Sequence, residues 1–269
     1  MLDFAAIAGW ISSGRMTEKV APARHFLNAS SIFQCCLRER LLSWRGRREG
    51  AREVSRKEAF CRAFGTFYHL FLQTLLEDFL LCTWTCRKCG WKSGFGRKPS
   101  VCQCGCRDFA MSETSLFDRR AQVAGFCDGV VDMAGLQRAV DGDDALEGFG
   151  PQDLWLMEIK TVGHPFFESA SQETLPEAWL WQANFYYKEV SRDLADLSGI
   201  VFLLLDRDTY AVRLIPSEPS WTVQEKLLAK ALDFQAHRKA GTLPPYEERA
   251  DCPSCPMAAA CMAEREAGR

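Results

Sequence analysis

The chain of 269 residues lacks several features that would assign it to a class at once. It has no run of 18 or more apolar residues, so we expect no membrane-spanning helix. Its N-terminus lacks the basic start of a secretory signal, so we expect no export. The net charge is −2, which gives no global nucleic-acid signature. We also find no internal repeat.

One local region is basic. Arginine and lysine outnumber glutamate over residues 38–62, but a solvated helix face with mixed charges explains this pattern more simply than a binding site does. The loop 139–153 is acidic and rich in glycine, so we expect it to be exposed.

Cysteine is the abundant residue that stands out. The chain has 13 cysteines, and most of them are clustered. Without an export signal a reducing compartment is expected, and clustered cysteines there indicate metal ligands before disulfides.

Strands and helices are mixed along the chain. Helical patterns, apolar strand-like runs and a Cys/Gly-rich insert alternate, which predicts an α/β fold with a mixed central sheet flanked by helices. We expect helices at 55–82, 176–192 and 219–240, strands or hairpin arms at 121–134, 154–163, 198–206 and 209–215, and an inserted cysteine module at 84–109.

The strand "LWLMEIKTVG", residues 154–163, carries Glu158 and Lys160 two places apart and therefore on one face. A salt bridge is the simple explanation. However, a second carboxylate, Asp128, sits in the apolar, β-prone stretch "GFCDGVV", although it could equally be a turn residue before Gly129. Two carboxylates on neighbouring strands can share a divalent cation, and a nearby lysine can orient the attacking water. This combination suits phosphodiester hydrolysis.

Two predicted helices carry further polar residues. His69 lies on an otherwise apolar helix, where a core histidine is commoner than a metal ligand. Gln182 and Tyr186 share one face of a later helix, which alone is only a polar patch.

The order of these motifs resembles that of the RecB-type PD-(D/E)XK nucleases, which have a restriction-endonuclease-like core. The motifs are Gly65-x-x-x-His69, Gly125-x-x-Asp128-Gly129, Glu158-x-Lys160 and Gln182-x-x-x-Tyr186. Cys127 stands where the superfamily's eponymous proline would be. The resemblance implies Lys160 beside the attacking water, Gln182 and Tyr186 positioning the active site and the DNA strand, and a metal site formed by His69, Asp128, Glu158 and Ile159.

The C-terminal stretch "DCPSCPMAAACM" contains three cysteines, whereas a metal or iron–sulfur site usually has four. Cys35 or Cys36 could supply the fourth. The sequence is similar to the iron–sulfur branch of the RecB-type family, which includes the AddB nuclease domain and the CRISPR-adaptation exonucleases, and Cys36-Leu37-Arg38 fits its pattern better. The resemblance implies a [4Fe-4S] cluster, against the alternatives of zinc or unliganded thiols, on Cys36, Cys252, Cys255 and Cys261.

The inner group, "CRKCGWKSGFGRKPSVCQCGC", has the spacing of a zinc ribbon. Cys86 and Cys89 are the first pair. We favour Cys104, because Gly105 follows it as Gly90 follows Cys89, and then Cys102 over Cys106. Cys61, Cys82 and Cys127 are expected to be buried. The ribbon's basic and aromatic residues suggest contact with phosphate and bases, or else simply face water: Arg87, Lys88, Trp91, Lys92, Arg97 and Lys98.

The residues themselves predict metal-dependent phosphodiester cleavage with Mg²⁺ or Mn²⁺. With the family resemblance, the leading hypothesis is a metal-dependent DNA nuclease. The resemblance implies an exonuclease acting on single strands or DNA ends, in the cytoplasm of a prokaryotic cell or phage-infected host, with replication, recombination or CRISPR-adaptation proteins as partners. The alternatives are an inactive DNA-binding adaptor and a structure-specific endonuclease. The expected regions are a helical 1–83, the ribbon 84–109, the nuclease core 110–216 and a C-terminal segment 217–269.

Overall fold

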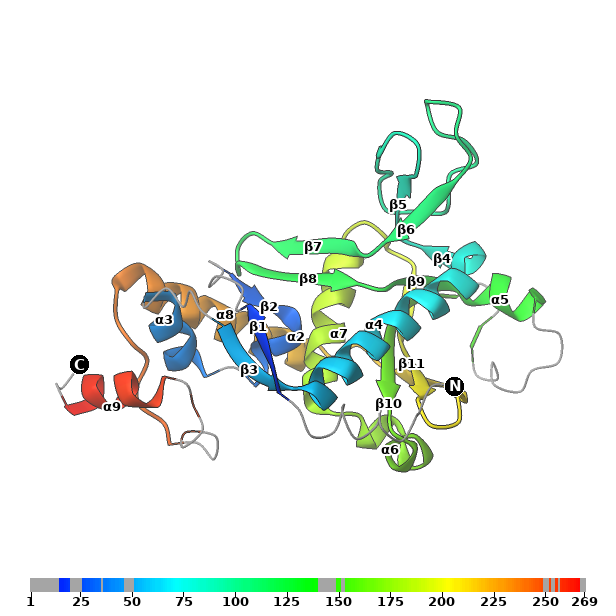
Figure 1. The fold of residues 1–269 in the computed structure, drawn as a ribbon. Helices are drawn as coiled ribbons and strands as arrows, with labels where there is room; N and C mark the ends of the chain where they lie inside the picture. The colour runs from blue at the N-terminus through cyan, green and yellow to red at the C-terminus, as the bar shows by residue number, and fades with distance from the viewer. Residues whose placement is uncertain are drawn as a thin grey trace.

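The structure is a computed structural model that describes residues 15–19, 26–34, 36–45, 51–139, 149–150, 153–248, 252, 255 and 257–266. It is a mixed α/β protein, as predicted, in which helices cover a central sheet (Figure 1). No helix within these ranges combines the length and apolar character needed to cross a lipid bilayer.

The central sheet is mixed, with the strand order β12-β11-β10-β9-β4. Strands β10 and β11 run parallel, and the other neighbours are antiparallel. The bounds of its strands are β4 Leu80–Leu81, β9 Gly129–Asp132, β10 Leu154–Val162, β11 Leu197–Asp206 and β12 Val212–Ser217.

Both faces of this sheet are buried, which explains the nearly continuous apolar runs of β10 and β11. One face packs on α7, α2 and α8, and the other on α4 and α5. The bounds of the helices are α2 Ala29–Ile32, α3 Leu37–Arg45, α4 Arg56–Leu75, α5 Met133–Ala139, α6 His164–Ser169, α7 Glu177–Val190, α8 Trp221–Ala240 and α9 Ala258–Glu266.

In the described part of the chain, three smaller sheets accompany the central one. The hairpin of β5 and β6 carries the cysteine-rich segment and projects away from the body of the molecule (Figure 1). The smaller strands and short 3-10 turns are β1 Arg15–Lys19, β2 Leu27–Asn28, β3 Ala51–Ser55, β5 Thr83–Cys86, β6 Phe109–Ser112, β7 Thr114–Asp118, β8 Val123–Cys127, η1 Glu77–Phe79 and η3 Gln172–Thr174.

Three expectations need correction. The helix predicted over 55–82 ends at Leu75, because Leu80 and Leu81 form β4 against β9. Cys82 and Cys127 are fully buried as predicted, but Cys61 is exposed on α4. In the loop 139–153, Phe149 is buried rather than exposed, while residues 140–148 and 151–152 lie outside the described residues.

Candidate active site and metal centres

The candidate active site begins where the chain leaves β8 and enters β9. Asp128 lies at this junction and is buried. Its Oδ2 accepts the main-chain N–H of Ile159 at 2.8 Å, and its Oδ1 lies 2.6 Å from Nε2 of His69. Burial lowers the pKa of His69, but the contact with Asp128 and the charge of Glu158 raise it overall. The carboxylate of Asp128 therefore contacts both helix α4, through His69, and strand β10, through Ile159.

Gln73 was missed by the sequence analysis. It lies one helical turn after His69, is buried, and donates from Nε2 to the main-chain oxygen of Asp128 at 3.1 Å. The i, i+4 spacing from His69 on α4 was the available signal, since such residues share a helix face. Gln73 fixes the backbone that carries Asp128.

Glu158 and Lys160 lie on the same face of β10, as the strand period requires. Lys160 Nζ lies 2.7 Å from Oε1 of Glu158, so the expected ion pair is present. Oε2 of Glu158 is buried without a hydrogen-bond partner. Burial and the charge of Asp128 outweigh Lys160 and raise the pKa of Glu158 to about 7. This oxygen therefore has lone pairs that no protein donor uses and that a cation could take.

The helix α7 supplies the next two residues of the site. Lys160 Nζ donates to Oε1 of Gln182 at 3.0 Å, and Gln182 Nε2 donates to the hydroxyl of Tyr186 at 3.1 Å. That hydroxyl also accepts the main-chain N–H of Phe126 at 3.3 Å. Burial raises the pKa of Tyr186, so it stays a neutral donor and acceptor. The ammonium of Lys160 is thus held through a relay that ends on β8.

Gly125 is required by this relay. A Cβ atom at position 125 would overlap the ring of Tyr186. The glycine of the Gly-x-x-Asp-Gly motif therefore provides the space into which the tyrosine of the Gln-x-x-x-Tyr motif packs.

The predicted residues His69, Asp128, Glu158, Lys160, Gln182 and Tyr186 thus come together in one place. Ile159 joins them only through its main chain, since its side chain packs in the core. The carboxylates of Asp128 and Glu158 and the orphaned Oε2 fit a hard divalent cation. Among the described residues, however, only four cysteines form a group whose ligand atoms all lie within 4.8 Å.

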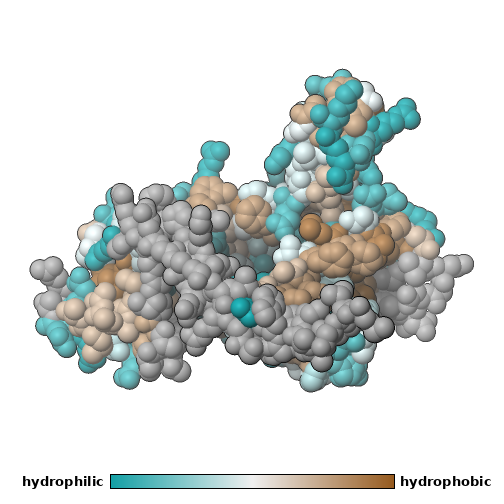
Figure 2. All heavy atoms as spheres, viewed as in Figure 1, coloured by the Kyte–Doolittle hydropathy of each residue, from teal (hydrophilic) through white to brown (hydrophobic). Residues whose placement is uncertain are grey.

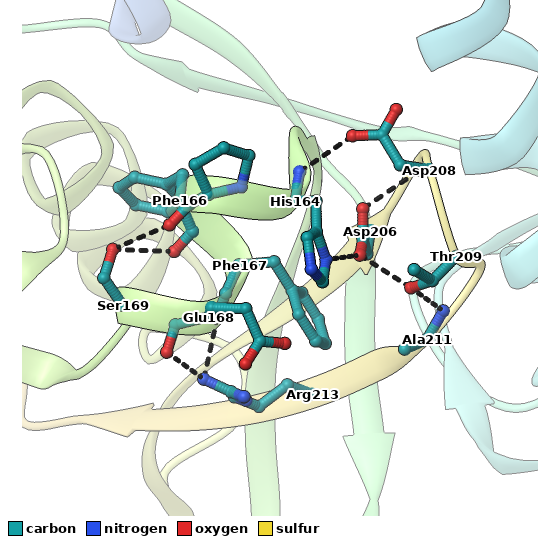
Figure 3. A network of polar contacts seen from close by, with 11 residues as sticks. His164, Phe166, Phe167, Glu168, Ser169, Asp206, Asp208, Thr209, Ala211 and Arg213 are labelled. Atoms are coloured by element: carbon teal, nitrogen blue, oxygen red, sulfur yellow. Dashed lines mark hydrogen bonds and ion pairs between the residues drawn. The ribbon is translucent and has the colours of Figure 1, made fainter.

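A cleft of about 490 Å³ opens beside this site. It lies between the first half of α4 and the ends of β10 and β11, and Ile159, Lys160 and His69 reach it. At its rim, the buried Asp206 holds the turn after β11 by accepting from His164, Thr209 and the main chain of Asp208 (Figure 3). The turn after β11, which forms one side of the cleft, is therefore held in place by hydrogen bonds to Asp206.

The four clustered cysteines are Cys86, Cys89, Cys102 and Cys104. Sulfur separations of 3.7 Å, from Cys86 to Cys104, and 3.6 Å, from Cys89 to Cys102, match the edge of about 3.8 Å in a tetrahedral zinc–thiolate site with 2.3 Å bonds. Cys106 is outside this group, and its sulfur accepts the main-chain N–H of Asp108.

Local backbone structure explains this geometry. Gly90 and Gly105 follow Cys89 and Cys104 with φ angles of 73° and 78°, in the left-handed region that favours glycine. The main-chain N–H of Cys89 lowers the pKa of Cys86 to about 6. The N–H of Cys104 also lowers the pKa of Cys102, but burial and the neighbouring sulfurs raise it to about 12. A cation would relieve this crowding of thiolates.

Some basic residues of this module form ion pairs with carboxylates of the same chain. Arg97 pairs with Asp132 of β9, and Lys98 pairs with Glu77 at 2.9 Å and lies over the ring of Trp84. Arg87 lies 3.3 Å from Asp108. Arg97 and Lys98 therefore attach the hairpin to the core, which the sequence analysis did not foresee.

The second set of cysteines lines a smaller cavity of about 70 Å³ between α3 and α9. Arg38 is buried here, and its Nε donates to the sulfur of Cys261 at 3.4 Å. The structure thus brings the Cys-x-Arg segment to the late cysteines, while Cys35 lies outside the described residues. The cavity is lined by all four predicted cluster ligands, Cys36, Cys252, Cys255 and Cys261.

These four sulfurs do not form a group with ligand atoms within 4.8 Å of one another, unlike the four of the hairpin. A single zinc ion needs sulfurs about 3.8 Å apart. The four thiols nevertheless line one cavity, and cysteine thiolates are ligands of both zinc and iron–sulfur clusters.

Comparison with known proteins gives little more. No family model and no curated protein matches the chain. Among solved structures, 15 chains match it. One is the crystal structure of SSO0001, with a TM-score of 0.39 and 10% sequence identity, covering 89% of this chain and 87% of that chain.

Proposed function

We propose that this protein is a metal-dependent nuclease that hydrolyses phosphodiester bonds of DNA. The observation that carries the proposal is the unpartnered Oε2 of Glu158, buried beside Asp128 and Lys160. Such an oxygen is costly in its ionised form unless it binds a cation, and protonation is the alternative that relieves the cost. Asp128, Glu158, His69 and the main chain of Ile159 would hold Mg²⁺ or Mn²⁺, which would polarise the scissile phosphate.

Lys160 is held in position by hydrogen bonds to Glu158 and Gln182. Gln182 fixes the direction of its ammonium, and Tyr186 fixes Gln182. With one N–H given to Glu158 and one to Gln182, a third remains for the attacking water or a phosphate oxygen. Lys160 thus orients the nucleophile and offsets developing negative charge.

We further propose zinc in the hairpin and a [4Fe-4S] cluster between α3 and α9. The close spacing of the four sulfurs supports the first, and the thiol-lined cavity supports the second. Both would be structural: the first orders the hairpin, and the second joins two distant chain segments.

The test is to incubate the anaerobically purified protein with end-labelled single- and double-stranded DNA, with and without Mg²⁺ or Mn²⁺. We expect metal-dependent cleavage that Glu158→Gln and Lys160→Ala each reduce at least a hundredfold. Wild-type rates in the Glu158→Gln protein would rule out this site. Cleavage of linear but not covalently closed circular DNA would establish an exonuclease, and cleavage of both an endonuclease.

A further inference from the structure

The cleft beside Lys160 has two chemically different walls. One wall is the first half of α4, which contributes Phe60 and Phe64. The opposite wall is the end of β10 and the turn after β11, which contribute Lys160, Thr161 and Arg207. Tyr68 of α4 contacts Tyr210 of that turn, with ring centroids 5.9 Å apart, so the two walls are held against each other.

The aromatic wall is unusually exposed. Phe60 and Phe64 are 40% and 42% exposed, and their ring centroids are 4.4 Å apart. Figure 2 shows a hydrophobic ridge over α4. Exposed aromatic rings that line a cleft leave apolar surface in water, so they suit a ligand with flat apolar faces.

The opposite wall carries two cations and one carboxylate. Arg207 is exposed and has no ion pair with a described residue, and Gly163 leaves room for its guanidinium. Asp208 follows it and accepts the main-chain N–H of His164 at 2.9 Å (Figure 3), while Lys160 pairs with the buried Glu158. Arg207 is therefore the cation of this wall that can meet an anionic group without giving up an ion pair.

We propose that Phe60 and Phe64 form a base-stacking wall that sets the course of an unpaired nucleic-acid strand toward Lys160. Exposed aromatic rings on one wall and the guanidinium of Arg207 on the other match a single strand, which presents bases on one side and phosphates on the other. A duplex keeps its base faces covered and cannot use the aromatic wall. The inference rests on the proposed nuclease function and adds the two residues that select unpaired strands.

The test measures binding rather than cleavage, so that it stands apart from the test of the nuclease. Fluorescein-labelled oligodeoxythymidylate of 12 nucleotides is titrated with full-length protein without added divalent metal, and anisotropy is recorded. A second oligonucleotide of equal length and charge carries abasic sites in place of the central bases. Wild-type protein should bind the thymidylate at least fivefold more tightly than the abasic strand.

The variant Phe60→Leu/Phe64→Leu keeps apolar volume but removes both rings. Phe117→Leu is the matched control, since Phe117 is also 42% exposed but lies on β7 and does not line the cleft. We expect the double variant to lose at least fivefold in affinity for thymidylate and to bind the two strands equally. The control should retain the wild-type preference.

Two results would overturn the proposal. The first is an unchanged preference for bases in the Phe60→Leu/Phe64→Leu protein. The second is a change in oligomeric state by size-exclusion chromatography with unchanged DNA affinity, which would make the ridge a protein interface. If wild-type protein binds thymidylate with the expected preference but never cleaves it, the stacking wall stands and the nuclease proposal fails.

Discussion

Replacing Glu158 by glutamine should stabilise the protein above neutral pH. Glu158 is buried, and its pKa is raised from the ordinary 4.5 to about 7. In the unfolded chain the carboxyl loses its proton near pH 4.5, whereas the folded protein holds that proton until about pH 7. The contribution of this group to stability is therefore full below pH 4.5 and is lost as the pH rises through 7.

The size of the effect follows from the same values. Each unit of pKa corresponds to about 1.4 kcal/mol, so the ionised Glu158 costs the folded state about 3 kcal/mol at pH 8. Glutamine has no such proton equilibrium, and its side-chain oxygen can still accept from Lys160. The free energy of unfolding of Glu158→Gln minus that of the wild type should therefore rise by about 3 kcal/mol between pH 4.5 and pH 8.

Urea denaturation at pH 5, 6, 7 and 8, without added divalent metal, measures this difference. Glu248→Gln is the control, because Glu248 is exposed and outside the site. A difference that stays constant across this pH range would refute the reasoning. Added Mn²⁺ should stabilise the wild type more than Glu158→Gln, since a carboxylate binds a divalent cation more tightly than a neutral amide oxygen does.

Cys255→Ser should remove a brown chromophore and lower thermal stability, and elemental analysis that finds zinc but no iron in the wild type would contradict the cluster. Lys92→Ala should raise the DNA concentration for half-maximal cleavage and flatten its salt dependence, whereas an equal half-saturation point would show that Lys92 only faces water. Arg97→Ala should instead raise protease sensitivity of the hairpin, because the ion pair with Asp132 is lost, and an unchanged digestion rate would count against it. Gln182→Ala should lower kcat by about tenfold or more with little change in KM, since it acts through Lys160; a shift in KM alone would assign it to binding.

Much of this architecture was predictable because the signals are local. The apolar runs of β10 and β11 and the helical pattern of α7 lead directly to the observed elements. The spacing of Glu158 and Lys160 fixes their common face, since a strand alternates with a period of two. The glycines after Cys89 and Cys104 likewise indicated that these two cysteines occupy equivalent turns, because each turn has a residue with left-handed φ after the cysteine.

The rest depends on contacts between distant segments. Nothing near Arg97 in the sequence announces Asp132, and nothing near Arg38 announces Cys261. The end of α4 was misplaced because its apolar pattern continues through Leu80 and Leu81, and only pairing with β9 makes these residues a strand. The exposure of Cys61 likewise depends on which face of α4 meets the sheet.

Helix α3 packs beside cysteines near the end of the sequence, Cys252, Cys255 and Cys261, and this affects the order in which the protein can fold during synthesis. Arg38 is buried against Pro244 and Cys261, and Cys36 shares a cavity with Cys252. A ribosome adds about 5–20 residues per second, so about 10–40 s separate the synthesis of Cys36 from that of Cys252. Throughout this interval the guanidinium of Arg38 must stay hydrated, and α3 cannot settle into its final place. The cysteine-lined cavity can therefore close only after Cys252, Cys255 and Cys261 have been synthesised.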